Sequence, residues 1–231
     1  MVLKIEGASA DSRAFGDARK FLASLDDRWA EHIESIGDCL HQPKPLRSPY
    51  EALVRAIAYQ QLHAKAGDAV LSRLIALYKG NSFPSPEELA ATDPSWLRTC
   101  GFSARKVETI QGIALGAIDG LIPDIDEAQS LPDEELIKRL TILRGVGRWT
   151  VEMLLMYTLD RKDVLPVDDY GVRVGYQRLQ GLDELPKPKK LRSIAEAWSP
   201  HRTAAAWYLW RVPAAGSQSE DKTDAQVAAT Q

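Results

Sequence analysis

Hydrophobic side chains recur at helical spacing along most of this 231-residue chain. Leu136, Leu140 and Leu143, for example, lie four and three residues apart, which places them on one face of a helix. No stretch alternates polar and apolar residues convincingly, as a half-buried strand does. We therefore predict an all-α protein, with helices over about 14–25, 27–37, 49–62, 65–79, 86–91, 93–99, 104–119, 130–143, 148–159, 169–179, 192–198 and 200–212.

Two glycines, Gly145 and Gly147, separate the helices predicted for 130–143 and 148–159. We expect Val146 to pack inside this turn. The first backbone N–H groups of the second helix then point outward, which suits a phosphate oxygen. A Gly-x-Gly turn also commonly serves only to join two helices, so this signal alone does not decide between the two roles.

The helix predicted for 169–179 has two carboxylates at its start, Asp168 and Asp169. The positive end of the helix dipole favours an ionised carboxylate at this position. Successive helical residues point about 100° apart, so the two side chains are not expected to share one site. Without other information, both aspartates fit the ordinary role of helix caps.

Together, the segments LRGVGRWT at 143–150 and LPVDDYGV at 165–172 are similar to the motifs of the helix-hairpin-helix DNA glycosylases. The chain most closely resembles the alkylation-repair branch, typified by 3-methyladenine DNA glycosylase II, over about residues 45–212. This resemblance implies a two-lobed all-α fold with the active site in the cleft between the lobes. It also implies hydrolysis of the N-glycosidic bond of alkylated purines in duplex DNA during base excision repair.

The resemblance divides the chain into expected parts. Residues 1–49 are expected to pack with 165–212 in one lobe, and 50–145 to form the other. Relatives often begin with an additional β-rich domain. The N-terminal segment has too few residues and too little alternation for one, so we expect a compact form without it. The helix-hairpin-helix is expected over 130–160, and 213–231 is expected to be a disordered tail because it has no apolar period.

In similar glycosylases the acting acid occupies the position of Asp169, and Asp168 is then left to cap the helix. A carboxylate near the anomeric carbon stabilises the cationic sugar that forms as the base departs, and can orient the incoming water. A cationic alkylated base is expected to lie against electron-rich rings. The resemblance assigns this base pocket to Trp149, Tyr170 and Trp210, with Met153 where the family often has another aromatic residue. Met153 suggests a wider or differently selective pocket, and core packing is the alternative for each tryptophan.

The resemblance also assigns contacts with the DNA backbone to the hairpin. Relatives bind a monovalent cation through hairpin carbonyl groups. The resemblance implies the same backbone site here, and no side-chain ligand in this sequence marks it. In relatives that also cleave the strand, a lysine occupies the position of Trp149; tryptophan cannot form an imine, so a monofunctional enzyme is expected. The expected backbone contacts are Leu143, Gly145, Val146, Gly147, Arg148 and Thr150.

A polar corner follows the helix predicted for 49–62. Similar glycosylases insert a side chain here to fill the gap left by the extruded nucleotide, and either Gln61 or Leu62 fits that role. A polar helix end without function is the alternative.

Composition narrows these expectations further. The two cysteines, Cys39 and Cys100, are too few for a zinc site or an iron–sulfur cluster, and His63 has no partner at ligand spacing, so we expect neither a side-chain metal site nor a required cofactor. The net charge is −3, of which the tail contributes −2, so any basic DNA-binding face must be local. The first twenty residues contain charges and no apolar run, so we expect no signal peptide, and no segment has the apolar length that we expect of a membrane span. We expect a cytoplasmic, nucleoid-associated monomer.

Two alternatives to a glycosylase for alkylated purines remain. The same architecture could act on another damaged base, such as 8-oxoguanine, uracil or a deaminated purine. A non-catalytic DNA-binding module, using the hairpin for backbone contact alone, is the other.

Overall fold

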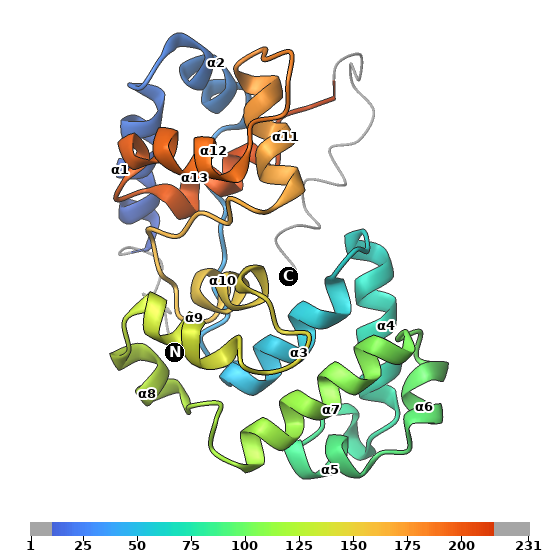
Figure 1. Cartoon of the computed structure of the whole chain (residues 1–231). Coiled ribbons are helices and arrows are strands. Elements are labelled where there is room, and N and C mark those ends of the chain that lie inside the picture. The colour runs from blue at the N-terminus through green and yellow to red at the C-terminus, as the bar shows by residue number, and fades with distance from the viewer. Residues whose placement is uncertain (1–10, 215–231) are drawn as a thin grey trace, which may run out of the picture. The chain divides into compact units, whose positions relative to one another are not determined.

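The structure, a computed structural model, describes residues 11–214 as two compact units. The first unit combines residues 11–41 with 162–214, and the second comprises residues 42–161. Throughout 11–214 the regular structure is helical and contains no strand (Figure 1), which confirms the all-α prediction. Of the predicted tail, residues 215–231 lie outside the described residues.

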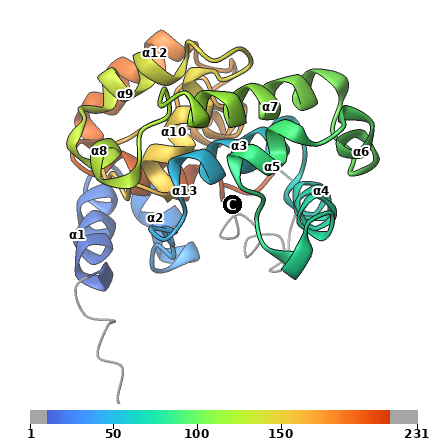
Figure 2. The same ribbon diagram turned by 90° about the horizontal axis from the view of Figure 1, so that it is seen from below.

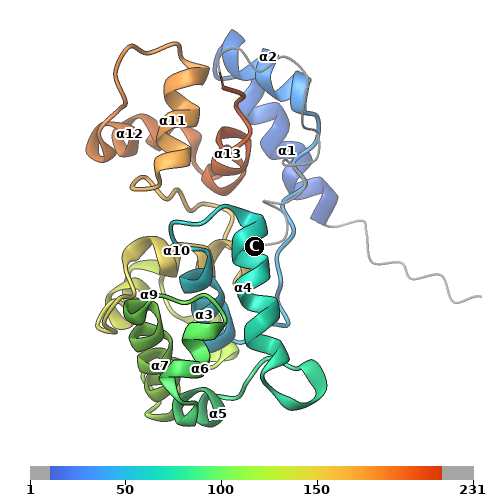
Figure 3. The same cartoon turned by 90° about the vertical axis from the view of Figure 1, so that its right-hand side faces the viewer.

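The first unit is assembled around α13, whose residues from Thr203 to Leu209 are all buried. Figure 3 shows α13 between α1 and α11, and it packs against both. The His32 ring bonds to the Tyr208 carbonyl oxygen at 2.9 Å, which ties α2 to the same helix. The helices of this unit are α1 (Asp11–Ala23), α2 (Asp27–Ile36), α11 (Tyr170–Leu179), α12 (Pro188–Ile194), the short 3-10 helix η2 (Ala195–Trp198) and α13 (Arg202–Leu209).

The second unit is assembled around α3, which packs against α4, α7 and α10 (Figure 2). Leu53, Val54 and Ile57 of α3 are fully buried, so this helix is the core of the unit. The helices are α3 (Pro49–Tyr59), α4 (Ala64–Ala76), the 3-10 helix η1 (Lys79–Asn81), α5 (Pro86–Ala91), α6 (Pro94–Thr99), α7 (Ala104–Ile118), α8 (Ile125–Ser130), α9 (Asp133–Leu140) and α10 (Arg148–Tyr157).

Side-chain caps explain where most of these helices begin. Ser48, Ser85 and Ser103 each accept a hydrogen bond from a backbone N–H of the following first turn. Ser85 and Glu88 form a reciprocal capping box at the start of α5. These starts agree with the helices predicted from 49, 86 and 104.

Several predicted helix starts are wrong. Helix α12, for example, begins at Pro188 instead of 192. Ser130 does not begin a helix; it ends α8, a short helix that the sequence pattern did not predict and that Asp124 caps, and α9 begins at Asp133. The last helix begins at Arg202 instead of 200, because the Asp163 carboxylate accepts from the Arg202 backbone N–H at 3.3 Å. The errors at 130 and 200 arise where an aspartate accepts a hydrogen bond from the first turn of a helix that carries little apolar periodicity.

None of the helices described is long and apolar enough to cross a membrane.

The close approach of α11 and α13 gives a test of the packing. A Cβ atom added at Gly175 would lie 2.0 Å from the Leu209 carbonyl oxygen, so the two helices would have to separate. We expect Gly175→Ala to lower the free energy of unfolding by about 2 kcal/mol or more. Gly16→Ala, in helix α1 of the same unit, meets nothing within 4 Å and should raise it by up to about 1 kcal/mol. Urea denaturation checks both, and equal effects would contradict the packing described.

Candidate active site

Asp169 is the N-cap of α11. Its Oδ1 accepts a hydrogen bond from the backbone N–H of Val172 at 2.8 Å. The prediction that Asp168 caps this helix is therefore wrong: the helix begins one residue later, at Tyr170, and the Asp168 side chain is exposed. Asp169 thus combines the cap with the position predicted for the acid.

A second donor reaches the same carboxylate from the end of α13. The indole Nε1–H of Trp210 donates to Asp169 Oδ1 at 3.0 Å. Gly171 keeps space for this contact, because a Cβ there would lie 3.0 Å from the Trp210 ring and 3.1 Å from Asp169 Oδ1. Two donors on one oxygen, a backbone N–H and an indole N–H, fix the direction of the carboxylate.

Tyr170, the first residue of α11, stands next to this carboxylate in the chain. It is 71% exposed, unlike the buried Trp207 of α13. A ring so exposed contributes little to the core, so burial gives no reason for an aromatic residue here. Trp207, by contrast, is packed inside the unit under the guanidinium of Arg211, as a core tryptophan.

In the second unit, the hairpin between α9 and α10 depends on Gly145. Its φ of +87° lies in the left-handed region that favours glycine. A Cβ at this position would lie 2.1 Å from Thr109 Oγ1 of α7. Val146 is buried, as expected for the residue inside the turn. Sequence reasoning missed Thr109, because only the folded chain brings it to the glycine.

Gly147 has a different role from Gly145. It is exposed, its φ is −96°, and a Cβ added there would meet nothing within 4 Å. It is the N-cap of α10 and has no side chain with which to cap the first turn of this helix. The fold therefore does not require glycine at 147, whereas a close approach of DNA to this backbone would.

The Arg148 side chain pairs with acids of its own unit. Its Nη1 donates to Glu134 at 3.0 Å, and its Nε donates to Glu152 at 3.0 Å. The hydrogen bonds to Glu134, followed by the charge of Glu152, raise the pKa of Arg148 above its ordinary value. Glu152, the partner of Arg148 on the same helix, is buried. Arg144, in the hairpin, is mostly exposed, and its Nη1 lies 3.4 Å from a carboxylate oxygen of Glu108.

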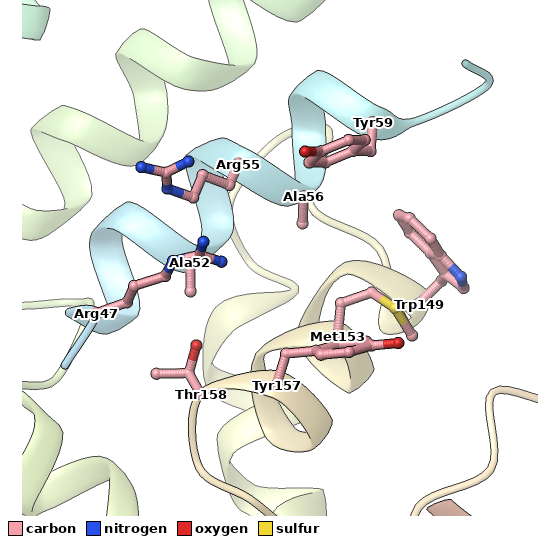
Figure 4. Close-up of a pocket in the computed structure, with 9 residues that line it drawn as sticks. All are labelled: Arg47, Ala52, Arg55, Ala56, Tyr59, Trp149, Met153, Tyr157 and Thr158. Atoms are coloured by element: carbon pink, nitrogen blue, oxygen red, sulfur yellow. The ribbon is translucent and has the colours of Figure 1, made fainter. Parts of the chain in front are cut away.

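Trp149 and Met153 line one small cavity of the second unit. Figure 4 shows side chains of α3, such as Tyr59, along one side of it and side chains of α10 along the other. Its volume of about 30 Å³ admits a water molecule but not a purine. Arg47 also lines it, and burial lowers the pKa of that guanidinium. The cavity alone is therefore no base pocket.

The corner between α3 and α4 exposes the two predicted wedge residues. Gln61 and Leu62 are both exposed, and Gln61 has a φ of +60°. His63 follows as the N-cap of α4, with its Nδ1 accepting from the Ala66 backbone N–H at 3.3 Å. His63 was not predicted as a cap, since histidine is uncommon in that role.

The predicted site residues thus fall into two groups. The structure brings Asp169 and Trp210 together in the first unit, with Tyr170 next in the chain. The remaining predicted residues belong to the second unit, where the hairpin, the corner and the small cavity hold them. Across residues 11–214 there is no group of three or more histidine, cysteine, aspartate or glutamate side chains that could hold a metal ion.

Comparison with known protein families matches residues 54–201 to the HhH-GPD superfamily of base excision DNA repair proteins. The matched segment includes the hairpin and Asp169 and covers more than half of the chain. The chain belongs to this superfamily. Membership confirms the resemblance inferred from LRGVGRWT and LPVDDYGV.

Individual HhH-GPD relatives are similar over most of the chain. DNA-3-methyladenine glycosylase 1 of Schizosaccharomyces pombe is 42% identical over 212 residues, which cover 91% of this chain and 93% of that protein. DNA-3-methyladenine glycosylase 2 of Escherichia coli is 30% identical over 171 residues, covering 70% of this chain and 56% of that protein. The solved structure of the S. pombe 3-methyladenine DNA glycosylase in complex with abasic DNA superposes with a TM-score of 0.80 at 44% identity, covering 84% of this chain and 95% of that one.

The two hairpin glycines are expected to respond differently to alanine. Gly145→Ala should lower the free energy of unfolding by more than about 2 kcal/mol, because of its left-handed φ and the clash with Thr109. Gly147→Ala should lower the free energy of unfolding by less than about 1 kcal/mol, because it changes only the helix cap, but weaken binding to duplex DNA about tenfold by obstructing hydrogen bonds to phosphate. Thermal melting and fluorescence anisotropy measure the two effects. DNA affinity unaltered in Gly147→Ala would show that this backbone does not contact the duplex.

Proposed function

We propose that this chain is a monofunctional DNA glycosylase that hydrolyses the N-glycosidic bond of alkylated purines, of the 3-methyladenine type, in duplex DNA. Its relatives support the substrate class, since the S. pombe protein that is 42% identical over 91% of the chain is named for it. One observation carries the chemistry: the Asp169 carboxylate is held at a helix N-terminus by the Val172 and Trp210 N–H groups.

In the proposed reaction, the bond between the base and the anomeric carbon breaks with both electrons leaving on the base. The sugar becomes cationic, and the Asp169 carboxylate stabilises that charge and orients the water that adds to the anomeric carbon. The water gives up a proton to the Asp169 carboxylate, which passes it to solvent, and the products are the neutral free base and an abasic site with a hydroxyl group on the anomeric carbon. A carboxylate whose direction is fixed before the reaction contributes most, because it needs no reorganisation when the charge develops.

An alkylated purine carries positive charge, so its departure needs little protonation by the protein. Electron-rich rings bind a cationic base more tightly than a neutral one by about 0.5–2 kcal/mol. We assign this contact to Trp149, Tyr170 and Trp210, with Met153 beside them. Trp149 also stands where strand-cleaving relatives have lysine, so the abasic site is left uncleaved.

The hairpin and the corner supply the proposed DNA contacts. The backbone at Gly145 and Gly147, flanked by Arg148 and Thr150, holds phosphates. A monovalent cation would fit the carbonyl oxygens of these glycines, because such oxygens are hard ligands and glycine has no side chain to block access to them. The charge of such a cation would attract a DNA phosphate. Gln61 or Leu62 fills the gap left by the extruded nucleotide. We place this enzyme as a monomer on the nucleoid in the cytoplasm, with no required cofactor.

The acid is tested by Asp169→Asn. Asparagine still caps a helix, so the fold should persist, but it cannot carry the charge. We expect the single-turnover rate of base release from a methylated duplex to fall by at least about a hundredfold, with DNA affinity retained. Asp168→Asn, one residue earlier and exposed, is the matched control and should release base at the wild-type rate. A panel of duplexes containing alkylated, oxidised and deaminated bases or uracil should show preference for the alkylated purines.

Full activity of Asp169→Asn would remove this residue from the mechanism. Release of only 8-oxoguanine, uracil or a deaminated purine would keep the chemistry and change the substrate. A wild-type protein that binds DNA but releases no base from any duplex of the panel would be a binding module.

The Trp210 hydrogen bond is tested by Trp210→Phe, which keeps an aromatic ring and removes the donor. Losing one hydrogen bond to a charged group should slow base release about tenfold. Trp207→Phe on the same helix is the control, because within residues 11–214 its buried indole N–H has no hydrogen-bond partner. That variant should lose stability, by the cavity it leaves, and keep its rate per folded molecule. Equal rates for the two variants would show that the indole N–H does not act on Asp169.

A further inference from the structure

The corner formed by Gln61, Leu62 and His63 is held by residues that the mechanism does not use. All three side chains are exposed, and Leu62 is 39% exposed although it is apolar. Gln61 has a φ of +60°, a conformation that costs a non-glycine residue about 1–2 kcal/mol. Such a residue persists only when the surrounding contacts determine its conformation.

The principal contact comes from Lys106 of α7. Its Nζ donates to the carbonyl oxygen of Ala58 at 3.0 Å and to that of Gln60 at 2.6 Å. These carbonyls belong to the C-terminal end of α3, where helical acceptors lack intrahelical partners and the dipole is negative. Burial lowers the pKa of the Lys106 ammonium, so the charge is partly removed from water to make these bonds.

The corner is also tied to the hairpin side of the unit. The side-chain amide of Gln60 donates to Thr150 Oγ1 at 3.0 Å, in the first turn of α10. Thr109, against which Gly145 packs, lies three residues after Lys106 on α7 and so shares its helical face. One face of α7 therefore supports the base of the corner and the turn of the hairpin.

We propose that Lys106 is a positioning residue, which holds the exposed corner at 61–63 rigid and in register with the hairpin, so that it can enter the duplex at the damaged nucleotide. This inference rests on the proposed function, since it assumes that the corner meets DNA. A positioning role for Lys106 has a different consequence from a role in capping α3 alone. A cap alone would affect stability, whereas a positioning residue affects the insertion step at a given stability.

The test uses a duplex with a tetrahydrofuran abasic-site analogue opposite 2-aminopurine, whose fluorescence rises when its neighbours are unstacked. The variants are Lys106→Met, which removes both hydrogen bonds, and Lys106→Arg, which can restore them. The control is Lys79→Met, which removes one exposed positive charge from the same unit. Affinity for the same duplex without the analogue is measured in parallel, and thermal melting sets a temperature at which every variant is folded.

We expect Lys106→Met to lose most of the fluorescence rise and to bind the abasic duplex about tenfold more weakly, with affinity for undamaged duplex unchanged. Lys106→Arg should recover most of the signal, and Lys79→Met should match the wild type. A wild-type signal in Lys106→Met, an equal loss on undamaged duplex, or the absence of a signal in the wild type would each overturn the inference.

Because the analogue has no base, this assay needs no chemistry. Base release by the wild type, measured separately on the lesion panel, reports the proposed function. An insertion signal without base release would contradict the function and leave the role of Lys106 standing; base release with an unaltered Lys106→Met signal would do the reverse.

Discussion

The hydrogen bond from the Trp210 indole to the Asp169 carboxylate joins the end of α13 to the start of α11. Two glycines one turn apart on α11 make this possible, since Gly171 faces the indole and Gly175 faces the Leu209 backbone. Side chains at either position would push the helices apart and separate donor from acceptor. The packing of the first unit and the direction of its acid are therefore one constraint, and a loss in one should appear in the other.

The second unit follows the same principle with different residues. Helix α7 presents Lys106 to the carbonyl groups of the α3–α4 corner and Thr109 to Gly145 of the hairpin. A Cβ at Gly116, farther along α7, would lie 2.8 Å from Leu143 of the hairpin. One helix thus sets the positions of both elements that we propose to contact DNA, without itself contributing to the chemistry.

The sequence predicted those parts of the fold that local chemistry determines. Serine caps such as Ser103, and the glycines of the hairpin, act on neighbouring residues and can be recognised from their spacing. The sequence failed where partners are distant: Trp210 lies 41 residues from Asp169, and Lys106 lies 46 residues from Gln60. The resemblance assigns the acid to Asp169 and leaves the cap of α11 to Asp168, whereas only the folded backbone shows that Asp169 is itself the N-cap.

The proposed chemistry depends on the Asp169 carboxylate stabilising positive charge on the sugar. The most direct measurement compares affinities for two duplexes, one with a neutral tetrahydrofuran and one with a cationic pyrrolidine in place of the damaged nucleotide's sugar. Because enzymes bind transition-state analogues at least about a hundredfold more tightly, the wild type should prefer the cationic duplex by that factor, and Asp169→Asn should lose most of the preference. Equal affinity of the wild type for both duplexes, or an undiminished preference in Asp169→Asn, would contradict the central claim.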